Sequence, residues 1–429
     1  MIRLKYFFVS VAILLIAISC KHDPRSSKSI YSSKDTSMVV SNKETPKTID
    51  RINFYFENSG SMNGYLSGKN FKQTMHEIIT DDDPRLTPYF VNTKEYLTSN
   101  LLSKIDAKNI GTAGTSSSDH QFIFTNAIKN TIGNNLSIVV TDGIYSTPSG
   151  DVDIVEVDIK KAFEKALNEN AIETVVLKLS SHYKGIYYTE SDCKNVSIDQ
   201  ERPYYILLFG NKETIDNALK DIVTIEELPG FKEQARFFLT NNMKVDYTIL
   251  TQGEEKKGSF RRVVKGGNGL VTEIEDAERF NRGNEKYLQF AIAIDYSKLS
   301  IPDSYLLFKD NYEIDGGTGY KIEDIKTVES LSNSTTYSTI EKINEKENIS
   351  LSHLIVLKAE FNYTGELEIE LENNLPSWIK TTGLENDCDI KDNKSKTFAF
   401  DNLMIGISNA YNKVSDNKEY LELKLKIKH

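Results

Sequence analysis

The sequence contains few of the residues that usually mark a zinc, carbohydrate or nucleic-acid site. It has 3 cysteines, 6 histidines and 1 tryptophan in 429 residues. No cysteine or histidine spacing typical of a zinc site occurs, and the single Trp378 provides no aromatic platform for stacking on a carbohydrate. The formal net charge of -10 argues against nucleic acid, which needs clustered lysines and arginines, and against electrostatic docking on anionic lipids.

A hydrophobic run long enough to cross a bilayer is also missing. The longest run, Tyr6–Ile18, is almost entirely apolar, but a spanning helix needs about 20 such residues. Arg3 and Lys5 stand before it, and Ser19 and Cys20 follow. A basic start, a short apolar run and a small residue at its end indicate a secretory signal.

The end of this signal resembles the lipobox of bacterial lipoproteins. It reads Ala17-Ile18-Ser19-Cys20, with alanine where the family usually has leucine. The resemblance implies that Cys20 is lipidated and becomes the mature N-terminus. We therefore expect a lipid-anchored protein of the cell envelope, in the outer membrane of a Gram-negative bacterium. The alternatives are an ordinary cleaved signal and an uncleaved anchor.

Two cysteines remain if Cys20 is acylated. Cys193 and Cys388 lie far apart in the chain and could pair in an oxidising compartment. Cysteines in different predicted domains more often stay unpaired, so no disulfide is predicted.

Composition and pattern divide the chain into five segments. Residues 1–20 are the signal peptide. Residues 21–49 are rich in Ser, Lys, Thr and Asp without hydrophobic periodicity, which predicts a disordered tether. The remainder is long enough for more than one domain. We expect an α/β domain at 50–230, a β-rich domain at 231–345 and a β-rich C-terminal module at 346–429.

Apolar strands alternate with amphipathic helices from Arg51 to about Thr224. Short apolar strands separated by helices predict a mostly parallel sheet covered on both faces, which binds ligands beyond the carboxyl ends of its strands. The fold class is therefore α/β. The predicted strands are 52–56, 136–140, 174–179 and 204–209, and the predicted helices lie around 71–79, 124–132, 159–167 and 215–219.

The helical pattern fades after about Gly230, and several segments alternate apolar with polar residues, most clearly Leu421–Ile427. Such alternation predicts mainly antiparallel sheets with one solvated face. One short helix is expected around Leu403–Tyr411, and residues 328–350 are expected to form a long loop or linker. The predicted strands are 244–250, 258–264, 288–294, 354–361, 366–371 and 420–427.

Two polar turns follow apolar strands of the predicted α/β domain. The first contains Glu57, Ser59 and Ser61, and the second contains Asp142. A hard divalent cation such as Mg²⁺ takes oxygen ligands, which carboxylates and hydroxyls supply. If both strands are neighbours in one parallel sheet, the four side chains converge on one ion. The alternative is ordinary turn chemistry, with Ser61 capping a helix and Asp142 beginning a turn.

These turns resemble the metal-ion-dependent adhesion site of von Willebrand factor A-like domains. The family motif is Asp-x-Ser-x-Ser, in which Glu57 replaces the aspartate while Ser59 and Ser61 match the serines. A second family motif matches Thr141-Asp142-Gly143. The resemblance covers roughly residues 51–224. It implies a Rossmann-like domain that binds another protein, with a carboxylate of that partner completing the metal site.

The third metal ligand of that family is a threonine that precedes a helix. Ser118 lies directly before Asp119 and the predicted helix, so it takes this place best, and Thr115 is the alternative. Either hydroxyl could instead cap the helix. Because Glu57 is one methylene longer than aspartate, it could ligate an ion directly or crowd the ion out. Mg²⁺ is the expected cation, with Mn²⁺ or Ca²⁺ as alternatives.

The leading hypothesis is a metal-dependent protein-binding module without catalysis. One alternative is a metal-free envelope scaffold with a degenerate site. A less favoured alternative is a metal-dependent ester hydrolase with Ser59 or Ser61 as nucleophile, which would need further ligands around two metals and a base beside the serine. The histidines show no dyad spacing and are predicted to lie at the surface or in loops: His76, His120, His182 and His353.

A tyrosine cluster at 183–188 follows the third predicted strand. It could line the rim of a partner-binding surface, because interfaces favour tyrosine. The commoner role of such tyrosines is packing against their own domain.

Overall fold

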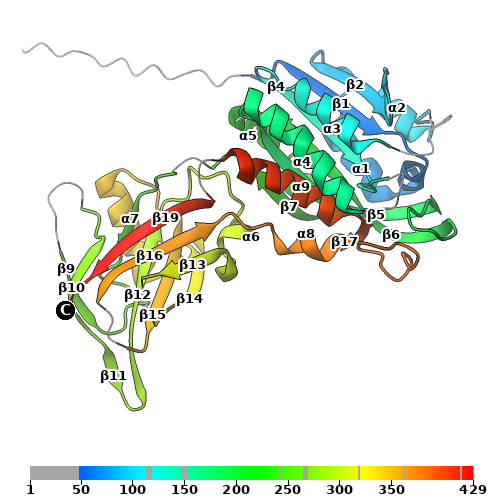
Figure 1. Cartoon of the computed structure of the whole chain (residues 1–429). Helices are drawn as coiled ribbons and strands as arrows, with labels where there is room; N and C mark the ends of the chain where they lie inside the picture. Colours follow the sequence, from blue (N-terminus) through cyan, green and yellow to red (C-terminus); the bar gives the residue numbers. More distant parts are fainter. Residues whose placement is uncertain are drawn as a thin grey trace, which may run out of the picture. The chain divides into compact units, whose positions relative to one another are not determined.

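The computed structural model describes residues 48–111, 118–146, 152–240, 243–263, 269–316, 319–361, 364–415 and 418–428. The predicted signal peptide, Cys20, nearly all of the tether and Thr115 lie outside these residues. Separate hydrophobic cores define an α/β part and a β part within residues 48–428 (Figure 1). Among the described helices, none has the length and apolar character needed to cross a membrane.

A seven-stranded sheet lies at the centre of the α/β part, with the order β3-β2-β1-β4-β6-β5-β7. Its central strands β1 and β4 are almost entirely buried, because helices cover both faces of the sheet. The strands are β1 Arg51–Glu57, β2 Leu86–Val91, β3 Glu95–Leu97, β4 Asn135–Thr141, β5 Glu173–Tyr187, β6 Val196–Gly210 and β7 Phe231–Phe237.

The sheet is parallel only at its centre, so the prediction of a mostly parallel sheet was wrong. β1 pairs in parallel with β2 and β4, whereas the pairs β2–β3, β4–β6, β5–β6 and β5–β7 are antiparallel. The cause is a long hairpin, because β5 leads directly into β6 and a hairpin makes its strands antiparallel. The sequence pattern predicted only the inner, apolar parts of these two strands.

The helices of the α/β part bury apolar residues at helical spacing. In α4, the buried residues Val155, Ile159, Phe163 and Leu167 follow one another at four-residue intervals and form one stripe. The helices are η1 Ser61–Ser67, α1 Lys69–Ile78, α2 Leu101–Asp106, α3 His120–Lys129, α4 Val152–Glu169, α5 Lys212–Asp221 and η2 Ile225–Glu227.

A C-terminal segment returns to the α/β core. Helix α9 (Phe400–Val414) lies beside α4 (Figure 1), so close that a Cβ on Gly406 would lie 2.7 Å from the carbonyl oxygen of Glu156. Asn409 also donates a hydrogen bond to the Glu156 carboxylate over 2.7 Å. Residues 377–414, which fall within the predicted C-terminal module, therefore contribute to the α/β core. This segment also contains α8 Ser377–Thr382, β17 Gly383–Leu384 and β18 Thr397–Phe398.

The β part consists of two sheets that share one core. One has the order β13-β16-β19-β10-β9, and the other has the order β11-β12-β15-β14 with β8 also paired to β12. All pairings are antiparallel except β10–β19, as expected from the period-2 pattern. The strands are β8 Tyr247–Ile249, β9 Ser259–Arg262, β10 Glu273–Glu278, β11 Phe280–Arg282, β12 Glu285–Ile294, β13 Tyr312–Asp315, β14 Tyr320–Thr327, β15 His353–Ala359, β16 Gly365–Glu372 and β19 Glu419–Ile427.

Strand β12 is buried on both faces. Phe290 and Ile292 belong to the core between the sheets, whereas Ala291 and Ala293 belong to a smaller core beneath helix α7, as the alternation of side chains along a strand requires. Helix α7 (Thr335–Glu347) lies in the segment predicted as a loop, which corrects that prediction. The pattern concealed it because only two residues of the helix are fully buried. The other helices here are α6 Asp303–Leu306, η3 Lys309–Asn311 and η4 Glu329–Leu331.

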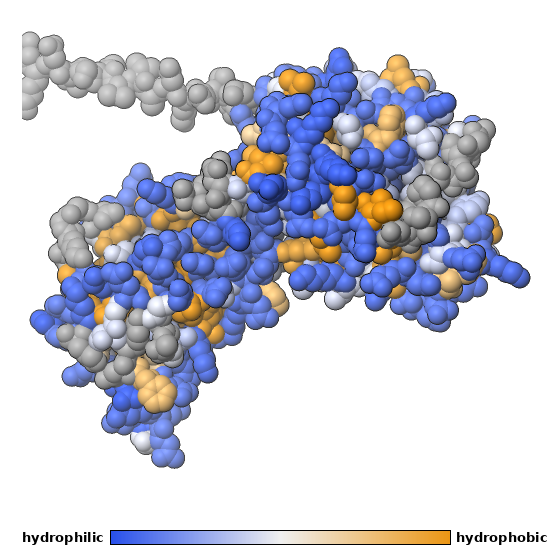
Figure 2. All heavy atoms as spheres, viewed as in Figure 1, coloured by the Kyte–Doolittle hydropathy of each residue, from blue (hydrophilic) through white to orange (hydrophobic). Residues whose placement is uncertain are grey.

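The face of the molecule drawn in Figure 2 is mostly hydrophilic, with hydrophobic residues in small separate patches. Scattered apolar residues are normal on a protein surface. This face therefore does not by itself indicate a large hydrophobic interface.

Candidate functional site

Strands β1 and β4 bring the two polar turns to one edge of the sheet. The strands are direct neighbours in parallel, with Phe56 opposite Val140. Glu57 and Thr141 are their last residues, so both chains leave the sheet at the same edge. The sequence argument required this arrangement, and the structure has it.

Glu57 accepts hydrogen bonds from two hydroxyls on other elements. Its Oε1 accepts from Ser118 Oγ over 2.6 Å, and its Oε2 accepts from Thr141 Oγ1. The carboxylate is buried, with 1% of the residue exposed. Glu57 therefore connects the end of β1 with both the end of β4 and the start of α3.

Ser118 is available for this contact because its neighbour caps helix α3. Asp119 is the N-cap residue, and its carboxylate accepts a hydrogen bond from Phe122 N over 2.9 Å. Ser118 is therefore not the N-cap of α3, and that alternative was wrong. Thr115, the other candidate for the third ligand, lies outside the described residues.

Ser59, Ser61 and Asp142 form the other half of the site. The Oγ atoms of Ser59 and Ser61 lie 3.1 Å apart, and Ser61 Oγ donates to Asp142 Oδ2. The other oxygen of Asp142 accepts a hydrogen bond from Ile144 N over 3.0 Å, which is turn chemistry of the predicted kind. Ser61 begins helix η1 without a side-chain capping bond. The structure thus gathers Glu57, Ser59, Ser61, Ser118 and Asp142 in one buried cluster.

His120 belongs to the same cluster, although it was predicted to lie at the surface or in a loop. It is fully buried at the start of α3. Its Nε2 lies 3.0 Å from Thr141 Oγ1 and 3.7 Å from Glu57 Oε2, and its ring stacks on Tyr145. Because the Thr141 hydroxyl donates its one proton to Glu57, Nε2 is the donor in the contact between His120 and Thr141.

Burial shifts the pKa of each titratable group in the cluster. It lowers the pKa of His120 to about 4, so the imidazole is neutral near pH 7. Burial also raises the pKa of Glu57, although the hydrogen bonds that the carboxylate accepts act in the opposite direction. Burial first, and the neighbouring Glu57 charge second, raise the pKa of Asp142 to about 7. Among the described residues, neither carboxylate forms an ion pair with a lysine or arginine.

The donor set fits a divalent cation. The predicted ligands supply only oxygen atoms, from two carboxylates and three hydroxyls, and Mg²⁺, Mn²⁺ and Ca²⁺ all take oxygen ligands. Two buried carboxylates without a cationic partner are costly to ionise. A cation among them would offset that cost.

No protein-family model, curated protein or solved structure matches the chain. The relation to von Willebrand factor A-like domains therefore stays a prediction from the two motifs and their order.

The tip of the β5–β6 hairpin lies beside the cluster. A Cβ on Gly60 would lie 2.8 Å from the ring of Tyr188, and the Glu190 carboxylate accepts a hydrogen bond from Ser146 Oγ over 2.8 Å. Tyr188 is partly exposed, whereas Tyr183 is buried and donates to Ile186 O. Of the tyrosines in the predicted cluster, Tyr183 and Tyr187 are therefore packed within their own domain, and Tyr188 is exposed beside Gly60.

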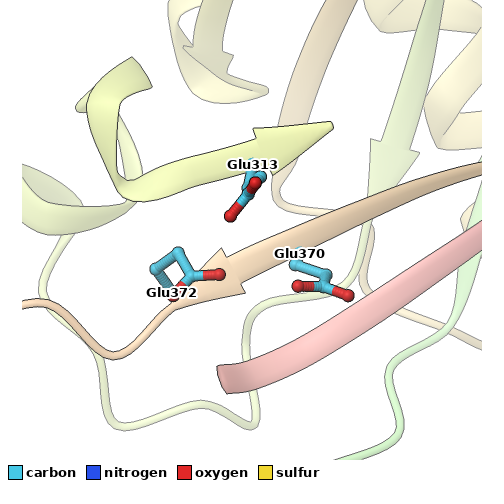
Figure 3. A group of neighbouring side chains, drawn as sticks. All are labelled: Glu313, Glu370 and Glu372. Carbon is cyan, nitrogen blue, oxygen red and sulfur yellow. The ribbon is translucent and has the colours of Figure 1, made fainter. Parts of the chain in front are cut away.

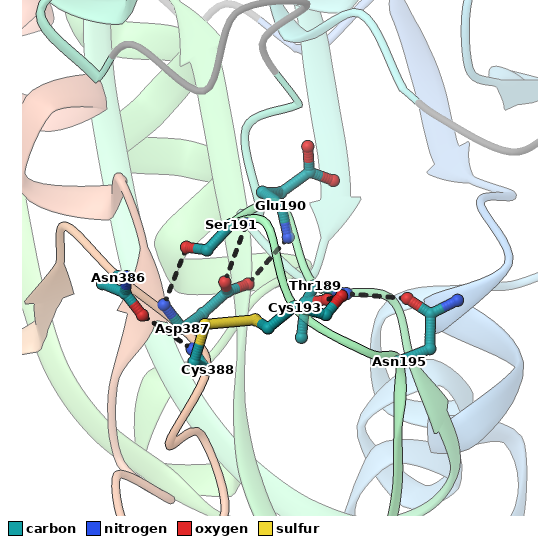
Figure 4. Close-up of a disulfide and its surroundings, with 8 residues drawn as sticks. All are labelled: Thr189, Glu190, Ser191, Cys193, Asn195, Asn386, Asp387 and Cys388. Atoms are coloured by element: carbon teal, nitrogen blue, oxygen red, sulfur yellow. Dashed lines mark hydrogen bonds between the residues drawn. A yellow bond between two sulfur atoms is a disulfide. The ribbon is translucent and has the colours of Figure 1, made fainter.

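A disulfide between Cys193 and Cys388 connects this hairpin tip to the segment before β18 (Figure 4). The two Cα atoms are 5.8 Å apart. The buried Asp387 carboxylate accepts hydrogen bonds from Glu190 N and Ser191 N, each over 3.0 Å. The sequence left this pairing open because it placed the two cysteines in different domains, whereas residues 377–414 pack on the α/β core.

A second group of acidic side chains lies on the β part (Figure 3). Glu313 on β13 stands opposite Glu370 on β16, with Glu372 two residues further along the same face. Glu370 also stands opposite Glu422 on β19. Glu313, Glu370 and Glu372 come close enough to share an ion, as do Glu368, Glu370 and Glu422, but they are exposed or half-buried, and such groups are common in proteins that bind no metal. The group alone assigns no site.

Proposed function

We propose that this protein is a lipid-anchored envelope protein whose α/β part binds another protein through a divalent cation, with Mg²⁺ the first candidate. Glu57, Ser59, Ser61, Ser118 and Asp142 would hold the cation. Bound there, the cation would supply positive charge and an open coordination position for a carboxylate of the partner protein.

The observation that carries this proposal is the burial of two carboxylates among hydroxyls. Glu57 and Asp142 have 1% and 2% of their surface exposed. Within the described part of the chain, no lysine or arginine pairs with either. Buried charges in proteins are normally paired or coordinate metals. An all-oxygen cluster at a sheet edge supports the second solution.

The hydrogen bonds of the cluster favour binding over ester hydrolysis. A serine nucleophile needs a base within hydrogen-bond reach. Ser59 contacts Ser61, and Ser61 donates to Asp142. The imidazole of His120 is directed at Thr141 and Glu57 instead. Asp142 is thus the one base that contacts Ser61 among the described residues, and no histidine contacts either serine, which favours ligand or structural roles for these hydroxyls.

The disulfide supports the envelope location. Cys193–Cys388 is the kind of bond that persists in an oxidising compartment outside the cytoplasm. The lipid anchor is tested separately with Cys20→Ser, which should abolish lipidation and membrane association. If the variant is processed and retained at the membrane like the native chain, the anchor proposal fails.

Calorimetric titration of the full chain with Mg²⁺, Mn²⁺ and Ca²⁺ tests the metal site. We expect one exchangeable ion of modest affinity, and we expect Ser59→Ala with Asp142→Ala to abolish its binding. Glu370→Gln with Glu372→Gln is the matched control, because it also changes clustered carboxylates, and it should leave the titration unchanged. Heat of binding that survives in the first variant but disappears in the second would place the ion on the β part.

A metal-free scaffold is the second candidate, and one observation favours it. Both oxygens of Glu57 already accept hydrogen bonds from Ser118 and Thr141, which is how a degenerate site would be stabilised. The two candidates predict different results when a chelator removes divalent cations. The metal-dependent module is supported if the native chain captures envelope proteins only in the absence of chelator. The Ser59→Ala, Asp142→Ala variant should then capture none. Equal capture under all conditions supports the scaffold.

A further inference from the structure

The β part contains a groove of about 680 Å³ beside helix α7. Ligand sites in proteins commonly have volumes of about 300–1,000 Å³. Its walls come from α6, α7, the end of β14 with η4, and the segments 296–301 and 349–353. All of the lining residues lie in the described part of the chain. The groove is distinct from the cluster around Glu57, and the inference drawn from it does not depend on the proposed metal site.

The groove combines apolar walls with one sign of charge. Leucine, isoleucine and valine side chains line it, and the charged lining residues are Asp303, Glu329, Glu341 and the titratable His353. Among the residues that line it, no lysine or arginine occurs. A groove that combines apolar side chains with carboxylates suits a ligand with apolar stems and cationic ends.

Among the described residues, no lysine or arginine pairs with any of these three carboxylates. Within the described residues, Glu329 and Glu341 form no ion pair, and Glu341 only accepts a long 3.5 Å hydrogen bond from Asn344. Asp303 is exposed, and its Oδ1 lies 3.4 Å from Nε2 of His353. The negative charge of the groove is therefore available to a ligand.

His353 places a buried ring nitrogen in the wall of the groove, beside Asp303. It has 4% of its surface exposed, and its Nε2 is buried without a hydrogen bond. This nitrogen faces Asp303, which lines the groove, while Nδ1 lies 3.0 Å from Ser352 Oγ. Burial lowers the pKa of His353 despite Asp303, so the ring does not cancel the carboxylate charge near pH 7.

We propose that this groove binds a basic peptide segment of a partner protein. The aliphatic stems of lysine or arginine side chains would lie on the apolar walls, and their charged ends would meet Asp303, Glu329 and Glu341. Binding therefore depends on salt, because part of the attraction is between exposed charges.

Fluorescence anisotropy with the full chain tests this assignment. The probe is a labelled short peptide of alternating lysine and leucine, compared with a matched peptide of alternating glutamate and leucine. We expect only the basic peptide to bind, more weakly at high salt. Glu329→Gln with Glu341→Gln should weaken binding about fivefold, the size expected for two exposed charge pairs.

Two further variants make the outcome decisive. Glu285→Gln with Glu345→Gln removes the same charge from exposed positions of the β part that do not line the groove, and it should bind like the native chain. Glu329→Lys with Glu341→Lys should reverse the preference and bind the acidic peptide. Thermal unfolding of each variant confirms that it is folded. Absence of binding by the native chain, equal loss in the control variant, or an unchanged preference after charge reversal would each overturn the proposal.

Discussion

Two groups of carboxylates in the described part of this protein differ in their exposure to water. Glu57 and Asp142 are buried at the end of two neighbouring strands, where hydroxyls donate to them. Glu313 lies on the edge strand β13, Glu370 and Glu372 lie on its neighbour β16, and all three are exposed or half-buried. Water and salt screen the second group but not the first.

The comparison shows why the number of carboxylates is a poor guide to a metal site. The exposed group has more of them, yet each can be solvated without any ligand. The buried pair cannot be solvated, so its charge must be removed by protonation, offset by hydrogen bonds or neutralised by a cation. Burial raises the pKa of both carboxylates in the pair, which is the first of these solutions in the absence of a cation.

The largest expected effect on stability comes from removing the disulfide that lies beside the buried pair. Cys193→Ser with Cys388→Ser should lower the free energy of unfolding by about 2–4 kcal/mol, because the bond constrains the unfolded chain. Urea denaturation measures the loss. Reductant should destabilise the native chain by the same amount and leave the variant unchanged. Equal stability of the native chain with and without reductant would mean that the bond does not restrain the site edge.

Asp142→Asn separates the charge of the buried pair from its hydrogen bonds. The amide can still accept from Ile144 N and can pair with Ser61. At pH 8 in chelator, the variant should be more stable than the native chain by about 1–3 kcal/mol, because a buried charge is removed. Mg²⁺ should reverse the order, since an ion stabilises only the protein that binds it. Thermal unfolding with and without Mg²⁺ measures both. If the variant stays more stable than the native chain when Mg²⁺ is present, the metal site is contradicted.

The pH dependence of stability follows from the direction of the Asp142 shift. Its pKa rises from the ordinary 3.8 to about 7 in the folded state, so the folded protein binds the proton more tightly. The resulting stability is fully present below about pH 4 and is lost as the pH rises through about 7. Protons and cations compete for the carboxylate, so Mg²⁺ should raise the melting temperature more at pH 8 than at pH 5. Asp142→Asn should remove this difference, and an equal rise at both pH values in the native chain would argue against the site.

The smallest effect is expected at the exposed group. Glu370 lies opposite Glu313 and Glu422, and like charges directly opposite are mildly destabilising. Glu370→Gln should therefore raise the free energy of unfolding by no more than about 0.5 kcal/mol, independently of Mg²⁺. Urea denaturation in both conditions checks this. A larger change that appears only with Mg²⁺ would mean that the ion binds on the β part.

Local sequence patterns predicted the elements that hold the candidate site. The apolar runs of β1 and β4 and the helical stripe of α4 reflect burial within one segment, which periodicity reveals. Strand β2 was missed because it contains Pro88 and its first residues are only half-buried, so neither its composition nor its alternation indicates a strand. Helix α7 was missed because only Thr336 and Ile340 of it are buried, which is too few to give a helical pattern.

Contacts between distant segments could not be predicted in the same way. Nothing in the residues around Cys388 indicates that α9 packs beside α4, and without that packing Cys193 has no partner. His120 lacked a signal for the same reason, because its contacts are with Thr141 and Glu57 on two other elements. The sequence identified the polar side chains of the candidate site, and the fold supplied their neighbours.

The most direct test of the central claim is the position of a bound ion. Crystals of the chain grown with Mn²⁺ should give one anomalous scattering peak between Glu57, Ser59, Ser61 and Asp142. No comparable peak should appear at Glu313, Glu370 and Glu372. A peak on the exposed group alone, or no peak at the buried pair at saturating Mn²⁺, would contradict the account.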